Sequence, residues 1–524
     1  MAERKTSADV KVALSIAGVL AIGGALIGGT GLAIVLTPIV FLILLYAMVR
    51  VPLRDSLLTL TFFSLTLENP SDQAGCGIWK SPLYGLGGIL LDHINSLDRS
   101  VSALSPFAFS GAEACMAALL LIALSRRLSG SKLDTAGRIA TPKPLVRLAL
   151  ISLAGTAFVW LTGLVRGGTF RFSLWQVNAV VHLPIIFLLF HMGFRGPKDH
   201  AALAKVFIAA AVVRASLAMY IMSAVTLPPD PDTGSTKLPY ATTHHDSMLF
   251  AGAFVVLIGM LIERVGRKST RLAYLLLPIL VGGMVENHRR MVWVQVAVVM
   301  LTVYLVAPDN KWKRTIRRTL MIVAPVVALY LFIGWDEKYG RLWKPVAMIR
   351  SVVDSKSDAS SFWRQLENYD LITTVQRNPL LGAGYGNPYE EVVTLPSIPY
   401  ELERYLPHNS ILGLWCYCGY IGYTAMTMLW VAGIYFGLRA YHATRDPKLR
   451  VAALASFGAV LIYLVQCWGD MGLGTWTGIF MVGPALAVAG KLAVATGAWG
   501  KSPASGGRAR ISSIPGTSGA EQAA

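Results

Sequence analysis

Residues 409–438 read NSILGLWCYCGYIGYTAMTMLWVAGIYFGL and contain no charged side chain. A helix needs about 20 predominantly apolar residues to cross a bilayer, so this stretch is long enough to span a membrane. Similar stretches recur along the chain, at 12–29, 31–49, 54–68, 104–125, 148–165, 174–194, 201–223, 247–263, 272–286, 291–307, 319–334, 451–468 and 472–495. They predict an all-α polytopic integral membrane protein with about 12–14 transmembrane helices.

The composition agrees with this fold class. Of the 524 residues, 54% are hydrophobic and 15% are charged, and the mean hydropathy is +0.54. About 25% of residues are charged in a typical soluble domain, so a soluble protein is excluded. The formal net charge of +18 would suggest nucleic acid as a partner of a soluble protein. Here it indicates basic loops on the cytoplasmic side of a membrane, and no nucleic-acid partner is expected.

Basic residues gather in alternate loops between the candidate spans. If the N-terminus is cytoplasmic, the basic segments 126–147, 195–198, 264–271, 311–318 and 439–450 all face inward. The intervening loops, 69–103, 166–173, 224–246, 287–290 and 335–408, are mostly poorer in basic residues, and 335–408 carries more acids than bases. This alternation predicts a multi-pass membrane protein with both termini cytoplasmic.

The same pattern divides the chain into three regions. Residues 1–286 are predicted to form a transmembrane scaffold, and 287–496 to form a region that contains the large periplasmic loop 335–408 with short helices. Residues 497–524, which are rich in Ser, Gly and Ala, are predicted to be a disordered cytoplasmic tail. Five cysteines, mostly in apolar runs, indicate neither a disulfide framework nor a metal site.

Two sets of polar residues allow alternative interpretations. Glu113 and Arg214 lie inside candidate spans, where they either pair with each other structurally or contact a substrate. The loop 224–246 contains Asp230 and Asp232 and the sequence His244-His245-Asp246, which could bind a metal. Two prolines and the lack of a second ligand set favour a turn, so no metal and no other cofactor are expected.

The loop 335–408 contains a predicted helix. Ser360 or Ser361 would cap this helix, and Asn378-Pro379 would end it. Phe362, Leu366 and Tyr369 have the spacing of one apolar face. Arg364 would lie in the first turn, where unpaired backbone amides and an arginine together favour an anion.

Three residues at the outer ends of spans suggest chemistry on a phosphate-bearing substrate. Arg290 opens one span, Arg364 lies in the loop helix, and His408 begins the span that returns to the cytoplasm. The planar guanidinium suits a diphosphate, and histidine suits proton transfer. Such residues also occur in loops simply for solubility. The glycines of 382–386 follow no strand, so a tight turn is favoured over a nucleotide site.

The order of several motifs resembles the O-antigen ligase and O-antigen polymerase superfamily. The segments that carry the resemblance cover about 287–422; they are Arg290-Met291-Val292-Trp293, Trp363-Arg364, the run NPLLGAGYG at 378–386, His408-Asn409-Ser410 and Gly419-Tyr420-Ile421-Gly422. Members are polytopic inner-membrane glycosyltransferases that need no metal. They transfer a glycan from undecaprenyl diphosphate to an acceptor at the periplasmic face.

The resemblance also implies roles for individual residues. Arg290 and Arg364 would hold the diphosphate, and His408 would deprotonate or orient the acceptor hydroxyl. Arg166 and Asn409 become substrate-binding candidates. The chain departs from the family at two places: Arg289 precedes Arg290 where the family often has Ser, so Arg289 could share or take its role. Tyr417 stands where an acid is common.

These observations leave more than one function open. A polysaccharide polymerase, for O-antigen or exopolysaccharide, is favoured because the N-terminal half is long and the loop 69–103 is large. A ligase that joins the glycan to lipid A core, as in lipopolysaccharide, is the first alternative. A non-enzymatic transporter of the same lipid is the second, although the two halves show no convincing repeat. The expected partners are a lipid-linked glycan donor, a glycan or lipid-linked acceptor, membrane lipid and a regulator of chain length.

Overall fold

The computed structural model describes residues 42–67, 110–131, 137–226, 241–309, 311–336, 359–395 and 402–500, with a few single residues between these ranges. In this part of the chain every regular element is a helix. The candidate span 12–29, much of 31–49, the loop 69–103 and most of the predicted tail lie outside the described residues.

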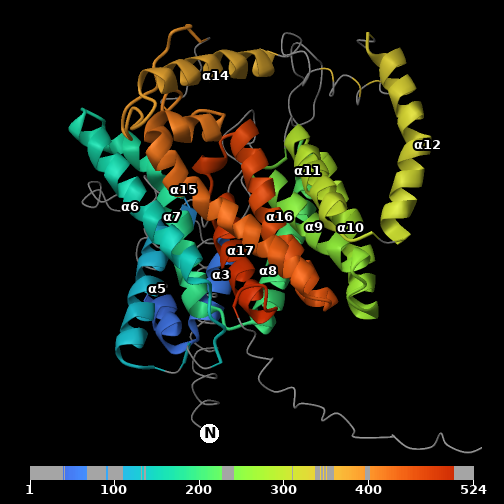
Figure 1. The fold of residues 1–524 in the computed structure, drawn as a ribbon, viewed down its shortest axis with the longest axis horizontal. Coiled ribbons are helices and arrows are strands. Elements are labelled where there is room, and N and C mark those ends of the chain that lie inside the picture. The colour runs from blue at the N-terminus through green and yellow to red at the C-terminus, as the bar shows by residue number, and fades with distance from the viewer. Residues whose placement is uncertain are drawn as a thin grey trace, which may run out of the picture.

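The helices follow the candidate spans closely (Figure 1). Those in the first half are α3 (Leu53–Thr66), α5 (Gly111–Leu128), α6 (Lys143–Val165), α7 (Phe170–Gly193), α8 (Pro197–Ala224) and α9 (Asp246–Ile262). Those in the second half are α10 (Arg267–Glu286), α11 (Arg290–Val306), α12 (Lys311–Gly334), α14 (Ala359–Arg377), α15 (Ser410–Ala443), α16 (Pro447–Gly469), the short η5 (Gly472–Gly474) and α17 (Trp476–Ala495).

Length and composition confirm a polytopic membrane protein. Among the described residues, 8 helices are long and apolar enough to cross a membrane, and α9 and α11 are shorter apolar helices. The total of 12–14 spans stays a prediction, because some candidate spans lie outside the described residues.

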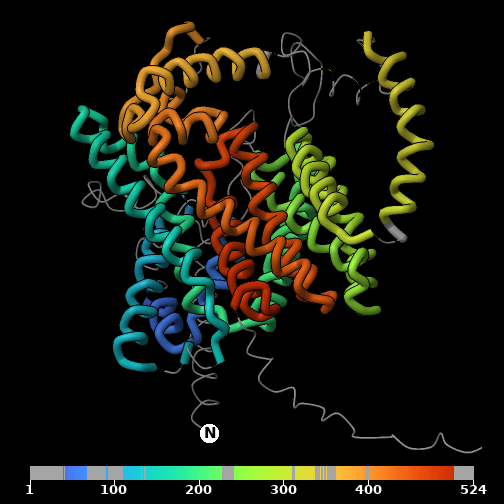
Figure 2. Tube along the Cα trace, viewed as in Figure 1, coloured from blue at the N-terminus to red at the C-terminus, as the bar shows by residue number. Residues whose placement is uncertain are grey.

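The centre of the bundle is built by α15, α16 and α17. α17 is the most buried of the candidate spans, at 89%, and it packs against α7 and α16. α15 packs against α6 and α16, so helices from the predicted scaffold region and from the C-terminal region share one core. α12 stands apart from the bundle, and none of its apolar window is buried (Figures 1 and 2).

One end of the bundle is covered by α14, the helix of the long loop (Figure 1). The beginnings of α7, α11 and α15 lie at this end, and the basic beginnings of α12 and α16 lie at the opposite end. In the described part of the chain, the span ends next to the predicted outer loops 166–173, 287–290 and 335–408 therefore lie at one end of the bundle, and the basic beginnings of α12 and α16 lie at the other.

α15 is broken where the long loop meets it. Gly419 has non-helical backbone angles, φ 58° and ψ −176°, and a Cβ there would lie 2.3 Å from the backbone of Leu380. A break inside a membrane helix exposes backbone groups that need partners. Loop residues provide them through hydrogen bonds of 2.8–3.3 Å, from Tyr420 to Pro379, Ile421 to Leu380, Ala383 to Cys416 and Gly384 to Tyr417. The predicted tight turn is thus docked into the broken helix.

The other side of the same turn is fixed to the corner between α6 and α7. The Gln176 side chain accepts from the amide of Gly386 at 2.5 Å and donates to the carbonyl of Asn387 at 3.2 Å. The amide of Thr169 donates to the Gly386 carbonyl at 2.8 Å. The loop therefore has a defined position between an early pair of helices and a late one.

The predicted apolar face of the loop helix is wrong. Phe362 and Tyr369 are 42% and 55% exposed, whereas Glu367, Asp370 and Thr374 on α14 are fully buried. The physical reason is the irregular chain beneath the helix, whose backbone amides need acceptors. Asp370 accepts from the amides of Val392 and Val393, and Thr374 accepts from Glu390.

Arg214 and Glu113 do not pair with each other. The Arg214 Nε donates to Asp246 at 2.9 Å in a buried ion pair between α8 and α9. Glu113 instead closes a capping box with Ser110 at the start of α5, and its carboxylate lies 3.5 Å from His182. Burial of an unpaired arginine is energetically costly, and Asp246 compensates the charge of Arg214. Both residues therefore have structural partners, which weakens the alternative of a substrate role.

Candidate functional site

The outer end of the bundle holds a cluster of charged side chains around Asp470. This residue directly follows α16, and its side chain is 7% exposed. Asp470 contacts His244, from the start of α9, and faces Arg364, from α14. The cluster therefore joins three segments that are far apart in the chain.

The Asp470 carboxyl is held in its ionised form. Burial by itself would raise the pKa of this carboxyl, but the hydrogen bond and charge of His244 and the charges of Arg364 and His408 together outweigh that effect. The pKa of Asp470 is consequently well below its ordinary value. A fixed negative charge thus faces the guanidinium of Arg364, while burial lowers the pKa of His244 and favours its neutral form.

Arg364 is the most accessible cation of this cluster. Its guanidinium Nη2 lies 3.7 Å from Asp470, beyond hydrogen-bond distance, and its side chain is 33% exposed. Its Nε is buried without a hydrogen-bond partner among the described residues. α14 begins at Ala359, so Arg364 lies in the second turn and the predicted site at the helix N-terminus is wrong. The Arg364 side chain still has N–H donors without partners, and these suit an anion.

His408 lies beside Arg364, directly before α15. Its backbone amide donates to Glu367 at 3.0 and 3.2 Å, and its Nδ1 lies 3.4 Å from the same carboxylate. Its ring makes an edge-to-face contact with Trp363 at 4.8 Å. The backbone carbonyl of His408 accepts from Met471, which links it to the residue after Asp470. Arg364 and His408, predicted separately, are therefore parts of one cluster.

The two neighbouring arginines at the start of α11 differ in their surroundings. Arg289 is half-buried, and its charge acts on His244, whose own carboxylate partner is Asp470. Arg290 is exposed at the first position of α11. Arg289 thus lies at the edge of the cluster, and Arg290 follows it at the exposed first position of α11.

Two other candidates have structural contacts. Arg166 donates to the carbonyl of Gly382 at 2.8 Å, which fixes the turn of the loop. Asn409 is buried and caps α15, because its side chain accepts from the amide of Leu412 at 3.1 Å. Through these contacts both residues support the structure around the site.

The sequence pattern does not identify three members of the cluster, Glu367, Asp470 and His244. Glu367 and Asp470 were not distinguished from other acids, although Asp470 stands alone between two apolar spans. For His244, the sequence suggests only a possible metal ligand. Within the described residues, no group of three or more His, Cys, Asp or Glu side chains is arranged to hold a metal ion.

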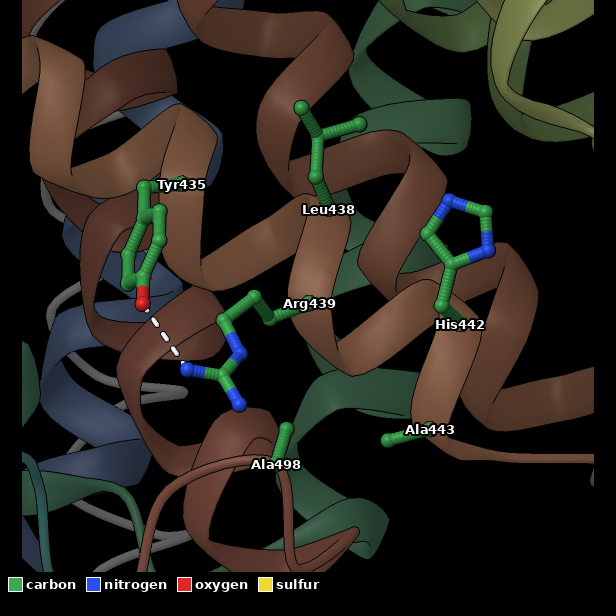
Figure 3. A pocket seen from close by; sticks show the side chains of 6 residues that line it. All are labelled: Tyr435, Leu438, Arg439, His442, Ala443 and Ala498. Carbon is green, nitrogen blue, oxygen red and sulfur yellow. Dashed lines mark hydrogen bonds between the residues drawn. The ribbon is translucent and has the colours of Figure 1, made fainter.

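A small enclosed hollow lies next to the cluster. Its volume is about 30 Å³, and Pro407, Ser410, Tyr417 and Met471 are among its lining residues. A larger groove of about 380 Å³ lies at the opposite end of α15, far from the cluster (Figure 3). It is lined by Tyr435, Leu438, Arg439, His442, Ala443 and Ala498. The small hollow has room for about one water molecule.

The fold and the cluster together define a polytopic membrane protein with a cationic site at one end of its helices. Residues 273–427 match the protein family described as O-antigen ligase. This match supports a relationship of that segment to the O-antigen ligase and polymerase superfamily, whose members are glycosyltransferase-type enzymes that use lipid-linked glycans in the membrane. No curated protein matches the chain.

The matched segment includes much of the cluster but not all of it. Arg289, Arg364 and His408 fall within 273–427, whereas His244 and Asp470 lie outside it on either side. The boundaries of the three predicted regions, at 286 and 496, stay predictions.

Proposed function

We propose that this protein is a polysaccharide polymerase that transfers a glycan from undecaprenyl diphosphate to an acceptor glycan at the periplasmic face of the inner membrane. The observation that carries this proposal is that Arg364 and His408 both face Asp470 in one cluster. A cation with unused donors and a residue able to accept a proton lie at the same end of the bundle. Glycosyl transfer from a diphosphate needs both functions.

The reaction follows from these two roles. The acceptor hydroxyl oxygen forms a bond to the anomeric carbon of the donor sugar, and its proton passes to the imidazole of His408. The bond between the anomeric carbon and the diphosphate oxygen breaks, and lipid diphosphate leaves with the electron pair. Attack opposite the leaving group inverts the anomeric centre. Arg364 stabilises the departing diphosphate, with Arg289 or Arg290 as a second cation and no metal in the step.

A ligase is the second candidate within the same chemistry. It would pass the glycan to lipid A core instead of to another lipid-linked glycan, and Arg364 and His408 would act in the same way. The polymerase is favoured by the long N-terminal half and the large loop 69–103, which leave room for two polymeric substrates.

A transporter of lipid-linked glycan is the third candidate. Its main support was the pair of charges inside spans, Glu113 and Arg214. The ion pair of Arg214 with Asp246 and the cap formed by Glu113 give these charges a structural explanation. The cluster lies at the end of the helices, whereas transport sites usually lie near the bilayer midplane.

Purified protein in liposomes with lipid-linked repeat units tests the proposal. The expected product is a series of longer glycans on the lipid, with His408→Ala producing only a small residual amount at the same protein concentration. Transfer to added lipid A core without elongation would identify a ligase instead. Movement of the lipid across the bilayer without any new glycosidic bond would overturn the enzymatic proposal.

A further inference from the structure

The face of α14 that packs on the protein is acidic. Glu367 and Asp370 are both 0% exposed, and each occupies the buried side of the helix above irregular chain. A buried carboxylate is costly unless its oxygens are hydrogen-bonded. The Oδ1 atom of Asp370 accepts from the backbone amides of Val392 and Val393 at 3.0 and 2.9 Å, whereas its buried Oδ2 has no hydrogen-bond partner among the described residues.

Glu367 has a different set of partners. It accepts from the backbone amide of His408 with both oxygens, at 3.0 and 3.2 Å, and it also faces the ring of the same residue. Among the ion pairs of the described residues, the one in which Glu367 takes part is that with His408. One carboxylate thus fixes both the backbone and the side chain of the residue that accepts the proton.

The geometry defines which ring nitrogen of His408 is available. Nδ1 lies 3.4 Å from the Glu367 carboxylate, and a carboxylate accepts only from a protonated nitrogen. Nδ1 therefore carries the hydrogen, and Nε2 carries the lone pair. The edge-to-face contact with Trp363 restrains rotation of the ring. A carboxylate in this place also stabilises the imidazolium that forms when Nε2 accepts a proton.

We infer that Glu367 is a positioning residue for the transfer reaction: it sets the tautomer and orientation of His408 and stabilises its protonated form. This inference rests on the proposed function, in which His408 accepts the proton of the acceptor hydroxyl. Glu367 itself touches neither substrate nor diphosphate. Its action is specific to His408, because Asp370, one turn further on, has the same burial and the same contact with backbone amides but no histidine.

Other charged groups surround this pair. Arg364 on the same helix and Asp470 after α16 face His408, and His244 contacts Asp470. Tyr389 and Tyr417 face Glu367 from the loop and from α15. Replacement of Glu367 by glutamine leaves all of these groups in place, so a change in pH dependence reports on the Glu367 charge alone.

The test measures transfer by purified protein over a range of pH. Glu367→Gln is expected to lower kcat by about tenfold or more without changing KM for the lipid-linked donor, a loss within the usual range for general acid–base catalysis. The acid limb of the kcat profile should move to lower pH, because the imidazolium loses a neighbouring negative charge. Asp370→Asn is the matched control, and it should leave the pH profile unchanged. An unshifted profile in Glu367→Gln would overturn the inference.

A double variant separates positioning from simple support of the loop. In a His408→Ala background, the further change Glu367→Gln should cost little, because residues that act as a unit are not additive. An equal loss in both backgrounds would show a structural role and refute the inference. A wild-type rate in His408→Ala alone would instead reject the proposed function, so the two failures are distinguishable.

Discussion

The guanidinium of Arg364 lies 3.7 Å from the carboxylate of Asp470, close enough for attraction but beyond a hydrogen bond. Asp470 meanwhile has a direct partner in His244. Arg364 is therefore attracted to Asp470 but makes no hydrogen bond with it, so its N–H donors remain available to an anion. This arrangement leads to the first prediction.

Arg364→Ala should lower the transfer rate by roughly 10²–10³, the usual effect of removing one electrostatic donor from an active site. Arg364→Lys should restore only part of this loss, since an ammonium cannot make the paired contact of a guanidinium. The measurement is glycan elongation with purified protein. Arg377→Ala is the control, because Arg377 lies exposed at the end of the same helix and pairs with Glu390. Equal transfer rates for Arg364→Ala and Arg377→Ala would show that Arg364 has no role in the reaction.

The two arginines at the start of α11 should differ in their effect. Arg289→Ala is expected to reduce transfer more than Arg290→Ala, because Arg289 is half-buried next to His244 whereas Arg290 is exposed. Rates of the two variants at equal expression give the comparison. A larger loss in Arg290→Ala would restore the role that the sequence resemblance implies for it.

Asp470 should make stability depend on pH in the acidic range. Its pKa is depressed in the folded protein, so its contribution is fully present above the unfolded carboxyl value of about 3.9 and is lost as the pH falls through the folded value. Thermal unfolding of detergent-solubilised protein should therefore show a falling Tm below about pH 4. Asp470→Asn should flatten this slope. The same slope in both proteins would contradict the assignment.

Gly419→Ala should destabilise the protein or prevent the loop from docking. The residue has φ 58°, and a Cβ would lie 2.3 Å from the backbone of Leu380. With ψ −176° as well, these backbone angles are ones that essentially only glycine adopts, so alanine is strained there in addition to the clash. Gly130→Ala is the control for a positive φ without a clash, since Gly130 has φ 66° with nothing within 4 Å of its Cβ. A clearly larger fall in Tm is expected for Gly419→Ala, and similar values would argue against close docking.

Removal of Arg214 should be costly because it strands a buried acid. Asp246 is 1% exposed, and breaking a buried ion pair typically costs 3–5 kcal/mol. Arg214→Met should therefore lower the yield of folded protein strongly. Arg214→Met combined with Asp246→Leu should recover much of that yield, because no charge is left unpaired. If the single variant alone folds like wild type, the ion pair contributes little.

The sequence predicts the helices well because the physical signal is strong. A run such as 451–468 must be helical and buried or in lipid, and α16 occupies it. The alternation of basic loops likewise predicts that Arg364 and His408 share one end of the bundle. These properties depend on local composition, which the sequence contains directly.

The parts that failed depend on contacts across the chain. Phe362 and Tyr369 have apolar spacing, yet the irregular segment beneath α14 needs acceptors for its amides, and this need buries Glu367 and Asp370 instead. Arg214 finds Asp246 rather than Glu113 because α8 and α9 pack side by side. His244 and Asp470 meet only in the folded chain, so neither motif nor periodicity could pair them.

The broken helix at Gly419 also has a consequence for biosynthesis. The hydrogen bonds between the turn at 379–384 and the broken helix can form only after α15 has been translated, and Arg364 and His408 face Asp470 only after α16 has been added. A ribosome-bound chain that has inserted every earlier helix therefore still lacks the site. The complete cluster therefore forms late in membrane insertion, when α16 and α17 pack against helices and a loop that were synthesised earlier.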